Sequence, residues 1–248
     1  MKSFAKVNIF LKIVGTRGAY HELSSRFMIV KSLFDEVDII PSDSNRFEID
    51  GNFSCKLEQN TIYKAYLELL KIEPKVESFF KSNRVVIDKK IPEGAGLGGG
   101  SSNCATFLKL VNDKCELNLT KDTLSQIGSK IGADVSFFVY DFEVANVSGI
   151  GEIVEQSNEK ALDLEIFTPD INCNTALVYK TFREKFFKLE NNINNYLLKN
   201  SCEIFEKFDI EDANDLFLSA THLYPQLLDF KKENWLFSGS GSSFFRLK

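Results

Sequence analysis

Residues 92–111, PEGAGLGGGSSNCATFLKLV, place five glycines within seven positions directly before a helical pattern. Each glycine loses more backbone entropy on folding than another residue would, at a cost of roughly 0.5–1 kcal/mol relative to alanine. The stretch therefore indicates that bare backbone is needed where the helix begins. A phosphate group is the first candidate ligand, because a helix start offers unpaired N–H groups and the positive end of its dipole.

Three familiar glycine-rich motifs do not fit this stretch. Gly94, Gly96 and Gly99 satisfy GxGxxG, but about 90 residues precede them, whereas that motif normally opens the first βα unit of a dinucleotide-binding domain. A P-loop needs a lysine after its last glycine, and a protein kinase would carry HRD and DFG; the sequence has none of these. A plain turn would need only one or two glycines. What remains is a loop whose backbone N–H groups surround phosphate oxygens, assisted by the hydroxyls of Ser101 and Ser102.

The composition is that of a globular chain of 248 residues, with 44% hydrophobic and 26% charged residues. Such a chain is long enough for two modest domains. A net charge of −5 and a pI of about 5.3 argue against nucleic acid as a partner. The five cysteines form no CxxC pair, which argues against a disulfide framework or a zinc site. Without a signal peptide or a run of about 20 apolar residues, we expect a cytoplasmic protein with no membrane partner.

The hydrophobic pattern predicts a mixed α+β chain in two lobes. Strands are expected at 4–14, 26–33, 36–41, 134–147 and 161–168, and helices after the glycines, after the capping residue Thr120, at 175–189 and between 212 and 230. Two closing strands joined by a Gly/Ser turn are expected in NWLFSGSGSSFFRLK (234–248). Alternation along the first strand places Lys6 and Asn8 on one face, about 6–7 Å apart.

The stretch PEGAGLGGGSSN resembles the phosphate-binding motif of the GHMP kinases, a family of small-molecule kinases. Further segments are similar to that family in order and spacing: AKVNIFLKIVGTRGAYHEL (5–23), IGADVSFFV (131–139), GIGE (149–152), NDLF (214–217) and FSGSGSSFF (237–245). Ser136 stands where proline is usual and Cys104 where alanine is usual. The resemblance covers nearly the whole chain.

The resemblance implies a two-lobed GHMP kinase fold of the α+β class. It predicts an ATP-binding N-terminal domain over residues 1–157, with a ribosomal-protein-like lobe, and a ferredoxin-like C-terminal domain over 158–248. Members of the family usually continue with another helix and strand after the third motif. Because the chain stops at Lys248, we expect a shortened C-terminal domain.

The resemblance further implies ATP-dependent phosphorylation of the 2-hydroxyl of 4-diphosphocytidyl-2-C-methyl-D-erythritol, in non-mevalonate isoprenoid synthesis. Two alternatives remain at this point. One is another GHMP small-molecule kinase, against which the Tyr20-His21 segment argues, because mevalonate and homoserine have no cytosine to recognise. The other is a catalytically inactive nucleotide-binding homologue, against which the presence of Lys6 and Asp134 argues.

Lys6 and Asp134 are the candidate catalytic residues. From the residues alone, an aspartate near a helix end is more often a cap, and a strand lysine is more often solvated. The resemblance assigns Asp134 as the catalytic base. It places Lys6 beside that carboxylate and the acceptor hydroxyl, where its charge would stabilise the transferring phosphoryl group.

The resemblance also assigns the binding residues. Those expected to bind ATP are Pro92, Gly94, Gly96, Leu97, Gly98, Gly99, Gly100, Ser101, Ser102 and Asn60. Those expected to bind the cytidine diphosphate-linked methylerythritol are Asn8, Tyr20, His21, Thr175, Tyr179 and Gly239. The expected cofactors are ATP and Mg²⁺; no metal ligand stands out, so the substrate phosphates are expected to hold much of the ion. The expected assembly is a monomer or a homodimer.

Overall fold

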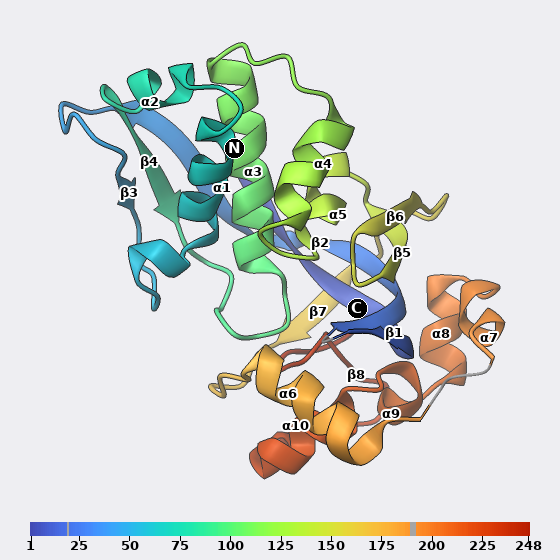
Figure 1. Cartoon of the computed structure of the whole chain (residues 1–248). Helices are drawn as coiled ribbons and strands as arrows, with labels where there is room; N and C mark the ends of the chain where they lie inside the picture. Colours follow the sequence, from blue (N-terminus) through green and yellow to red (C-terminus); the bar gives the residue numbers. More distant parts are fainter. Residues whose placement is uncertain (19, 189–191) are drawn as a thin grey trace. The chain divides into compact units, whose positions relative to one another are not determined.

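The computed structural model describes residues 1–18, 20–188 and 192–248, which pack into two compact units. Unit 1 consists of Met1–Ala5, Ser32–Ile91 and Gly99–Asp141; unit 2 consists of Lys6–Lys31, Pro92–Gly98 and Phe142–Lys248. The two long strands β1 (Lys2–Arg17) and β2 (Tyr20–Pro41) each contribute to both units. The mixture of helices with two sheets confirms the predicted α+β class (Figure 1). The predicted domain division at 157/158 follows sequence order and stays a prediction.

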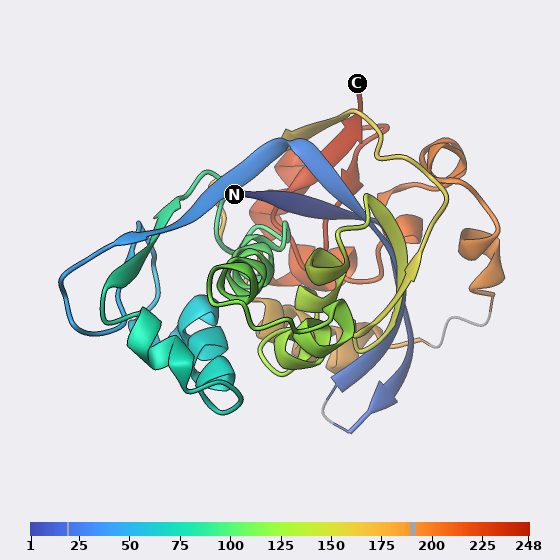
Figure 2. The ribbon, with the colours of Figure 1, turned by 90° about the horizontal axis from the view of Figure 1, so that it is seen from above.

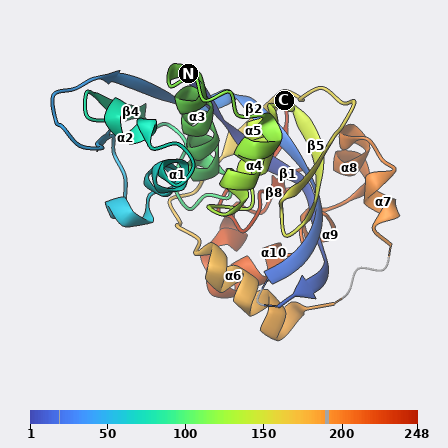
Figure 3. The same ribbon diagram turned by 45° about the horizontal axis from the view of Figure 1, so that its top comes forward.

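Unit 1 packs helices together beside a small sheet. The second half of β2 pairs antiparallel with β4 (Asn83–Asp88), and β3 (Ile49–Asp50) pairs parallel with β4. The helices are α1 (Thr61–Leu70), α2 (Lys75–Phe79), α3 (Gly99–Lys114), α4 (Lys121–Ser129) and α5 (Val135–Tyr140), with a 3-10 turn, η1 (Leu57–Gln59), before α1. Helix α3 packs against α1, α4 and α5 (Figure 3). The expected cap Thr120 is confirmed, because its side chain accepts a hydrogen bond from the N–H of Thr123.

The expected strand at 134–147 is wrong in its first half. Residues Val135–Tyr140 form the helix α5, and only Val144–Gly149 form a strand, β5. Every α5 residue from Val135 to Val139 is buried, including Ser136, so this part of the helix has no exposed face. A short apolar run has no polar face to reveal its period, and for that reason it reads equally well as a buried strand.

Unit 2 contains the first half of β2, a three-stranded second sheet and the C-terminal helices. The first half of β2 pairs antiparallel with β5, which pairs in turn with β6 (Ile153–Gln156). In the second sheet, β9 (Phe244–Leu247) lies between β7 (Leu164–Phe167) and β8 (Leu236–Phe237) (Figure 2). The helical segments are α6 (Thr175–Thr181), the π-helical turn η2 (Phe182–Phe186), α7 (Asn194–Leu197), α8 (Ser201–Lys207), α9 (Ile210–Ala213), α10 (Phe217–Leu223) and the 3-10 turn η3 (Pro225–Phe230).

Several expected elements of unit 2 are confirmed with changed bounds. The two closing strands exist and pair Leu236 with Phe245. The helix expected at 175–189 is α6 followed by η2, and its last position, 189, lies outside the described residues. The strands expected at 26–33 and 36–41 are one continuous β2, because Phe34 and Asp35, between the two predicted segments, continue the strand. Among the described residues, no helix has the length and apolar character needed to cross a membrane.

Candidate active site

The first part of the glycine-rich stretch, in unit 2, turns its carbonyl groups into the protein. Four consecutive carbonyl oxygens, those of Gly94, Ala95, Gly96 and Leu97, accept hydrogen bonds from Cys173 N, Ser243 N, Ser238 Oγ and Lys6 N at 2.9–3.1 Å. The donors come from three segments of unit 2, since Ser238 and Ser243 both belong to SGSGSS (238–243). These four hydrogen bonds hold the loop on the side to which its carbonyl groups point.

The φ angles of this loop alternate in sign. Gly94, Gly96 and Gly98 have φ of +64°, +75° and +69°, whereas the intervening Ala95 and Leu97 do not have positive φ. In a turn that visits the left-handed region, successive N–H groups can converge on an anion and form a nest. The conformation of residues 94–98 thus suits the phosphate-binding role predicted for them.

The last glycines open helix α3 in unit 1. The carbonyl of Gly100 accepts a hydrogen bond from Thr61 Oγ1 at 2.8 Å, which ties this end of the loop to the start of α1. The predicted ATP-binding residue Asn60 caps α1, since its Oδ1 accepts from the N–H of Ile62 at 2.9 Å. Asn60 directly precedes Thr61, the residue whose hydroxyl contacts Gly100. Capping gives Asn60 a structural role, and its contact with nucleotide stays a prediction.

The first turn of α3 also faces the segment that carries Asp134. A Cβ on Gly132 would lie 3.4 Å from Ser101 Oγ, so the two segments are in close contact within unit 1. Asp134 occupies the position before α5, yet its side chain makes no capping hydrogen bond. This removes the capping explanation for the aspartate and leaves the predicted role as a base open. Ser102 is 1% exposed, and its Oγ lies 2.7 Å from Ser3 Oγ.

A buried ionic network supports the loop from inside unit 1. Asp35, which is 0% exposed, accepts hydrogen bonds from the N–H groups of Lys90 and Ile91 at 2.7 and 2.8 Å. Its carboxylate also lies 2.5 Å from Lys89 Nζ and accepts from Asn103 Nδ2 at 2.8 Å. Asp35 thereby joins the chain just before the glycines to the helix just after them. Asp35 was not among the predicted residues, because nothing in the sequence marks an aspartate inside a strand as a loop anchor.

Lys6 and Asn8 meet inside unit 2. Lys6 Nζ donates to Asn8 Oδ1 at 2.6 Å, which confirms that the two side chains share one face of β1. Asn8 Nδ2 donates in turn to Ser25 Oγ at 2.9 Å, and the ammonium group lies 4.5 Å from the centre of the Phe27 ring. Lys6 is 3% and Asn8 2% exposed, so both polar groups are held in fixed positions by buried partners.

The third motif, SGSGSS (238–243), joins this cluster. A Cβ on Gly239 would lie 3.3 Å from Asn8 Oδ1, so the motif backbone passes directly over Asn8. Thr175 Oγ1 lies 2.8 Å from Ser240 Oγ. Asn214, which is 1% exposed, donates from Nδ2 to the carbonyls of Phe237 and Gly239 at 2.8 and 2.9 Å. Asn214 belongs to the NDLF segment, and the structure shows that it holds the third motif in shape.

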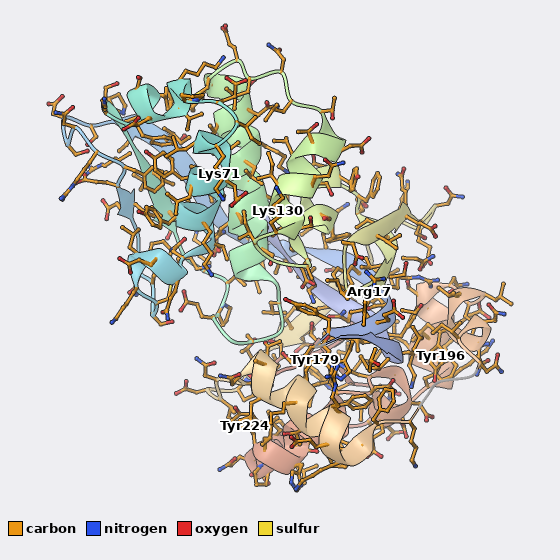
Figure 4. The ribbon with its side chains drawn as sticks, in the orientation of Figure 1. Arg17, Lys71, Lys130, Tyr179, Tyr196 and Tyr224 are labelled. Carbon is orange, nitrogen blue, oxygen red and sulfur yellow. The ribbon has the colours of Figure 1, made fainter. Side chains whose placement is uncertain are left out.

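Two of the predicted base-binding residues, Tyr20 and His21, begin β2, and a third, Tyr179, packs against His21. The rings of His21 and Tyr179 are 5.3 Å apart and inclined by 38°. Figure 4 labels Tyr179. Tyr20 is 64% exposed, whereas His21 is 8% exposed. Burial, and next the charge of Arg183, lower the pKa of His21 below its ordinary value of 6.5. Arg183 escaped the sequence analysis, because no pattern distinguishes it from the solvated cations around it.

The comparisons with known proteins agree with this arrangement. The model of the GHMP kinases N terminal domain matches residues 60–142, which include the whole glycine-rich stretch, α3 and Asp134. A solved structure of 4-(cytidine 5'-diphospho)-2C-methyl-D-erythritol kinase has a TM-score of 0.75 and 28% identity, covering 100% of this chain and 89% of that one. Fold and motif together define a small-molecule kinase of the GHMP class, and such kinases use ATP as phosphoryl donor.

Two full-length relatives narrow the assignment. The 4-diphosphocytidyl-2-C-methyl-D-erythritol kinase of Sulfurimonas denitrificans is 48% identical, over 100% of this chain and 96% of that protein. The protein of the same name from Sulfurovum sp. is 46% identical, over 100% of this chain and 98% of that protein. The chain belongs to the 4-diphosphocytidyl-2-C-methyl-D-erythritol kinase family.

Proposed function

We propose that this chain transfers the γ-phosphoryl group of ATP to the 2-hydroxyl of 4-diphosphocytidyl-2-C-methyl-D-erythritol, in the cytoplasm and without a nucleic-acid or membrane partner. The observation that carries the proposal is the buried cluster of unit 2, where Lys6 donates a hydrogen bond to Asn8 and Asn8 lies against Gly239. These residues come from opposite ends of the chain and were predicted to bind substrate or act in catalysis. The names of the full-length relatives supply the substrate.

The phosphates of ATP are proposed to bind the backbone of the glycine-rich stretch. The alternating φ of residues 94–98 suits an anion, and α3, with 16 residues, directs its positive dipole end toward the same stretch. Mg²⁺ is proposed to arrive with ATP. Among the described residues no three His, Cys, Asp or Glu side chains lie together to hold a metal ion, so the phosphates are its proposed ligands.

Asp134 is the proposed general base. Its carboxylate would take the proton of the 2-hydroxyl while that oxygen forms a bond to the γ-phosphorus. The bond between the γ-phosphorus and its bridging oxygen breaks, and ADP leaves with the electron pair. Lys6 is proposed to offset the negative charge on the transferring group, because a preorganised buried cation needs little reorganisation during the reaction. Asn8, held by Ser25, would orient the acceptor.

The cytosine base is proposed to lie between the exposed ring of Tyr20 and the ring of Tyr179, with His21 at its edge. Aromatic rings offer a base a flat apolar face, and each stacked base contributes about 1–3 kcal/mol in proteins that bind single strands. Thr175 is proposed to contact the same substrate through the third motif, since its hydroxyl lies 2.8 Å from that of Ser240.

The test is an ADP-release assay with the full chain, ATP and Mg²⁺. ADP should form with the cytidylated substrate and at a much lower rate with methylerythritol phosphate, which lacks the cytosine. Asp134→Asn should lower kcat by at least about a hundredfold, the usual scale for a positioned base, while ATP still raises the melting temperature. Asp141→Asn is the matched control. It removes a carboxylate at the other end of α5, and it should leave kcat within about twofold, because Asp141 contacts Lys109 and Lys121 rather than substrate.

Each alternative gives a different result in the same assay. A kinase for another alcohol would release ADP with that alcohol and not with the cytidylated substrate. An inactive homologue would show an ATP-induced thermal shift without turnover on any acceptor. Near-full turnover by a folded Asp134→Asn variant would refute the role proposed for this carboxylate.

A further inference from the structure

One guanidinium group holds both the ring of His21 and the backbone beside it. Arg183, in the turn η2, donates from Nε to His21 Nε2 at 3.4 Å. Its Nη2 donates to the carbonyl oxygens of Gly18 and Tyr20 at 3.3 and 3.1 Å. All of these residues belong to unit 2. Arg183 therefore connects the segment after α6 to the beginning of β2.

The direction of the hydrogen bond determines where the imidazole carries its hydrogen. A guanidinium group has donors and no acceptor, so His21 Nε2 must offer its lone pair. A neutral imidazole that accepts at Nε2 carries its hydrogen on Nδ1. We infer that Arg183 is a positioning residue that fixes His21 as the Nδ1–H form, so that His21 presents a hydrogen-bond donor to the base of the substrate.

The surroundings of the ring favour the neutral form. His21 packs against Tyr179 and against the edge of Phe182, with ring centres 5.3 and 6.0 Å away. Among the described residues, two titratable side chains face the imidazole from the helical segments packed on His21. One is the charged Arg183 and the other is Tyr179. Burial is the first cause of the lowered pKa of His21, and the positive charge of Arg183 is the second.

A donor at Nδ1 matches a pyrimidine that offers an acceptor on its edge. Cytosine has an acceptor at N3, whereas uracil carries a hydrogen there. An Nδ1–H donor directed at N3 would therefore favour a cytidylated substrate over its uridine counterpart. This inference rests on the proposed function, because it assumes that the base lies at His21.

The hydrogen position can be measured without any turnover. The chain contains two histidines, so His222→Gln leaves one imidazole in a protein labelled with ¹⁵N-histidine. At pH 8 the nitrogen shifts should show Nδ1 protonated and Nε2 unprotonated. Arg183→Met should lose this preference, because Nε2 no longer has a donor beside it. Arg183→Lys keeps a cation that only donates and should retain the preference.

Lys180→Met is the matched control, because Lys180 is a mostly exposed cation on the preceding helix that pairs with Glu184 at 3.9 Å. It should leave the nitrogen shifts of His21 unchanged. A protonated Nε2 in the His222→Gln parent, or the same shifts after Arg183→Met, would overturn the inference.

The kinetic readout is the KM of the cytidylated substrate relative to that of wild type. In Arg183→Met, loss of the hydrogen bond from His21 to the base should raise this KM roughly tenfold, with kcat changed by less than about twofold. The increase should shrink once the pH falls below the pKa of His21 in the variant, which a titration of the same nitrogen shifts locates, because an imidazolium ion carries hydrogens on both nitrogens and regains the Nδ1 donor. Simple damage to the fold would not be reversed by acid.

The two proposals fail in different ways. A KM ratio that does not recover at low pH would refute donation by His21 to the base, even if turnover is normal. No turnover of the cytidylated substrate by wild type would refute the proposed function and base recognition with it. The nitrogen shifts would still decide whether Arg183 sets the hydrogen position of His21.

Discussion

The two ends of the glycine-rich stretch contain glycine for different reasons. In unit 2, Gly94 and Gly96 have positive φ, and a Cβ on them would lie 1.9 Å from Asn172 Oδ1 and 2.0 Å from the Ser238 carbonyl oxygen. In unit 1, a Cβ on Gly100 would meet only Thr61 atoms at 3.8 and 3.9 Å, which is ordinary contact. A run of glycines therefore does not imply one purpose. The first glycines are required by the protein's own backbone, whereas neither conformation nor packing requires Gly100.

The supports of the two ends differ as well. The unit 2 end is held by hydrogen bonds to consecutive carbonyls, which depend on backbone shape. The unit 1 end is preceded by a buried carboxylate, Asp35, whose partners are Lys89, two backbone N–H groups and Asn103. A buried ion pair is sensitive to the loss of one member, because the other then stays buried without its counter-charge.

The largest expected loss of stability follows from this ion pair. Asp35→Ala should lower the free energy of unfolding by about 3–5 kcal/mol, because Lys89 remains buried without its carboxylate. Urea denaturation of the protein without ligand measures the loss. The double variant Asp35→Ala/Lys89→Met should be less destabilised than the single variant, because it leaves no buried charge. If the double variant is the less stable of the two, the unpaired cation is not the cause.

Gly96→Ala should have the next largest effect on stability. An alanine in the left-handed region costs roughly 1–2 kcal/mol, and overpacking against Ser238 adds roughly 1–3 kcal/mol. We expect the free energy of unfolding to fall by about 2–5 kcal/mol, measured by the same denaturation. A Gly96→Ala protein as stable as wild type would show that this end of the loop does not need glycine, and the difference between the two ends would disappear.

Much of this arrangement could be predicted from the sequence. The pairing of Lys6 with Asn8 follows from strand alternation, and the hairpin around the third motif follows from its Gly/Ser turn. The helix after the glycines follows from its apolar spacing. In each case a local period or turn residue carries the information.

The remaining contacts depend on partners far apart in the chain. Asp35 meets Asn103 across 68 positions, and Arg183 meets His21 across 162. No local pattern marks such residues, since a buried aspartate and an exposed one look alike in one sequence. The helix α5 was missed for a related reason, because burial on all sides removes the period by which a helix is recognised.

Gly100→Ala should change stability least and is the sharpest test of the phosphate-binding role. Alanine at this position, in the first turn of α3, is sterically tolerated and favours the helix, so the free energy of unfolding should stay equal or rise by up to about 1 kcal/mol. A methyl group there would nevertheless stand where the bare backbone is proposed to approach a phosphate. We expect ATP affinity to fall at least about tenfold, which is about 1.4 kcal/mol of binding free energy, and the ATP-induced thermal shift to shrink accordingly.

The control is Cys104→Ala, a substitution one turn further along α3 at a fully buried side chain, where burial raises the pKa of the thiol. This control should keep the full shift. If Gly100→Ala also keeps the full ATP-induced thermal shift, ATP does not need a glycine at this position. The proposed contact between phosphate and this end of the loop would then be wrong.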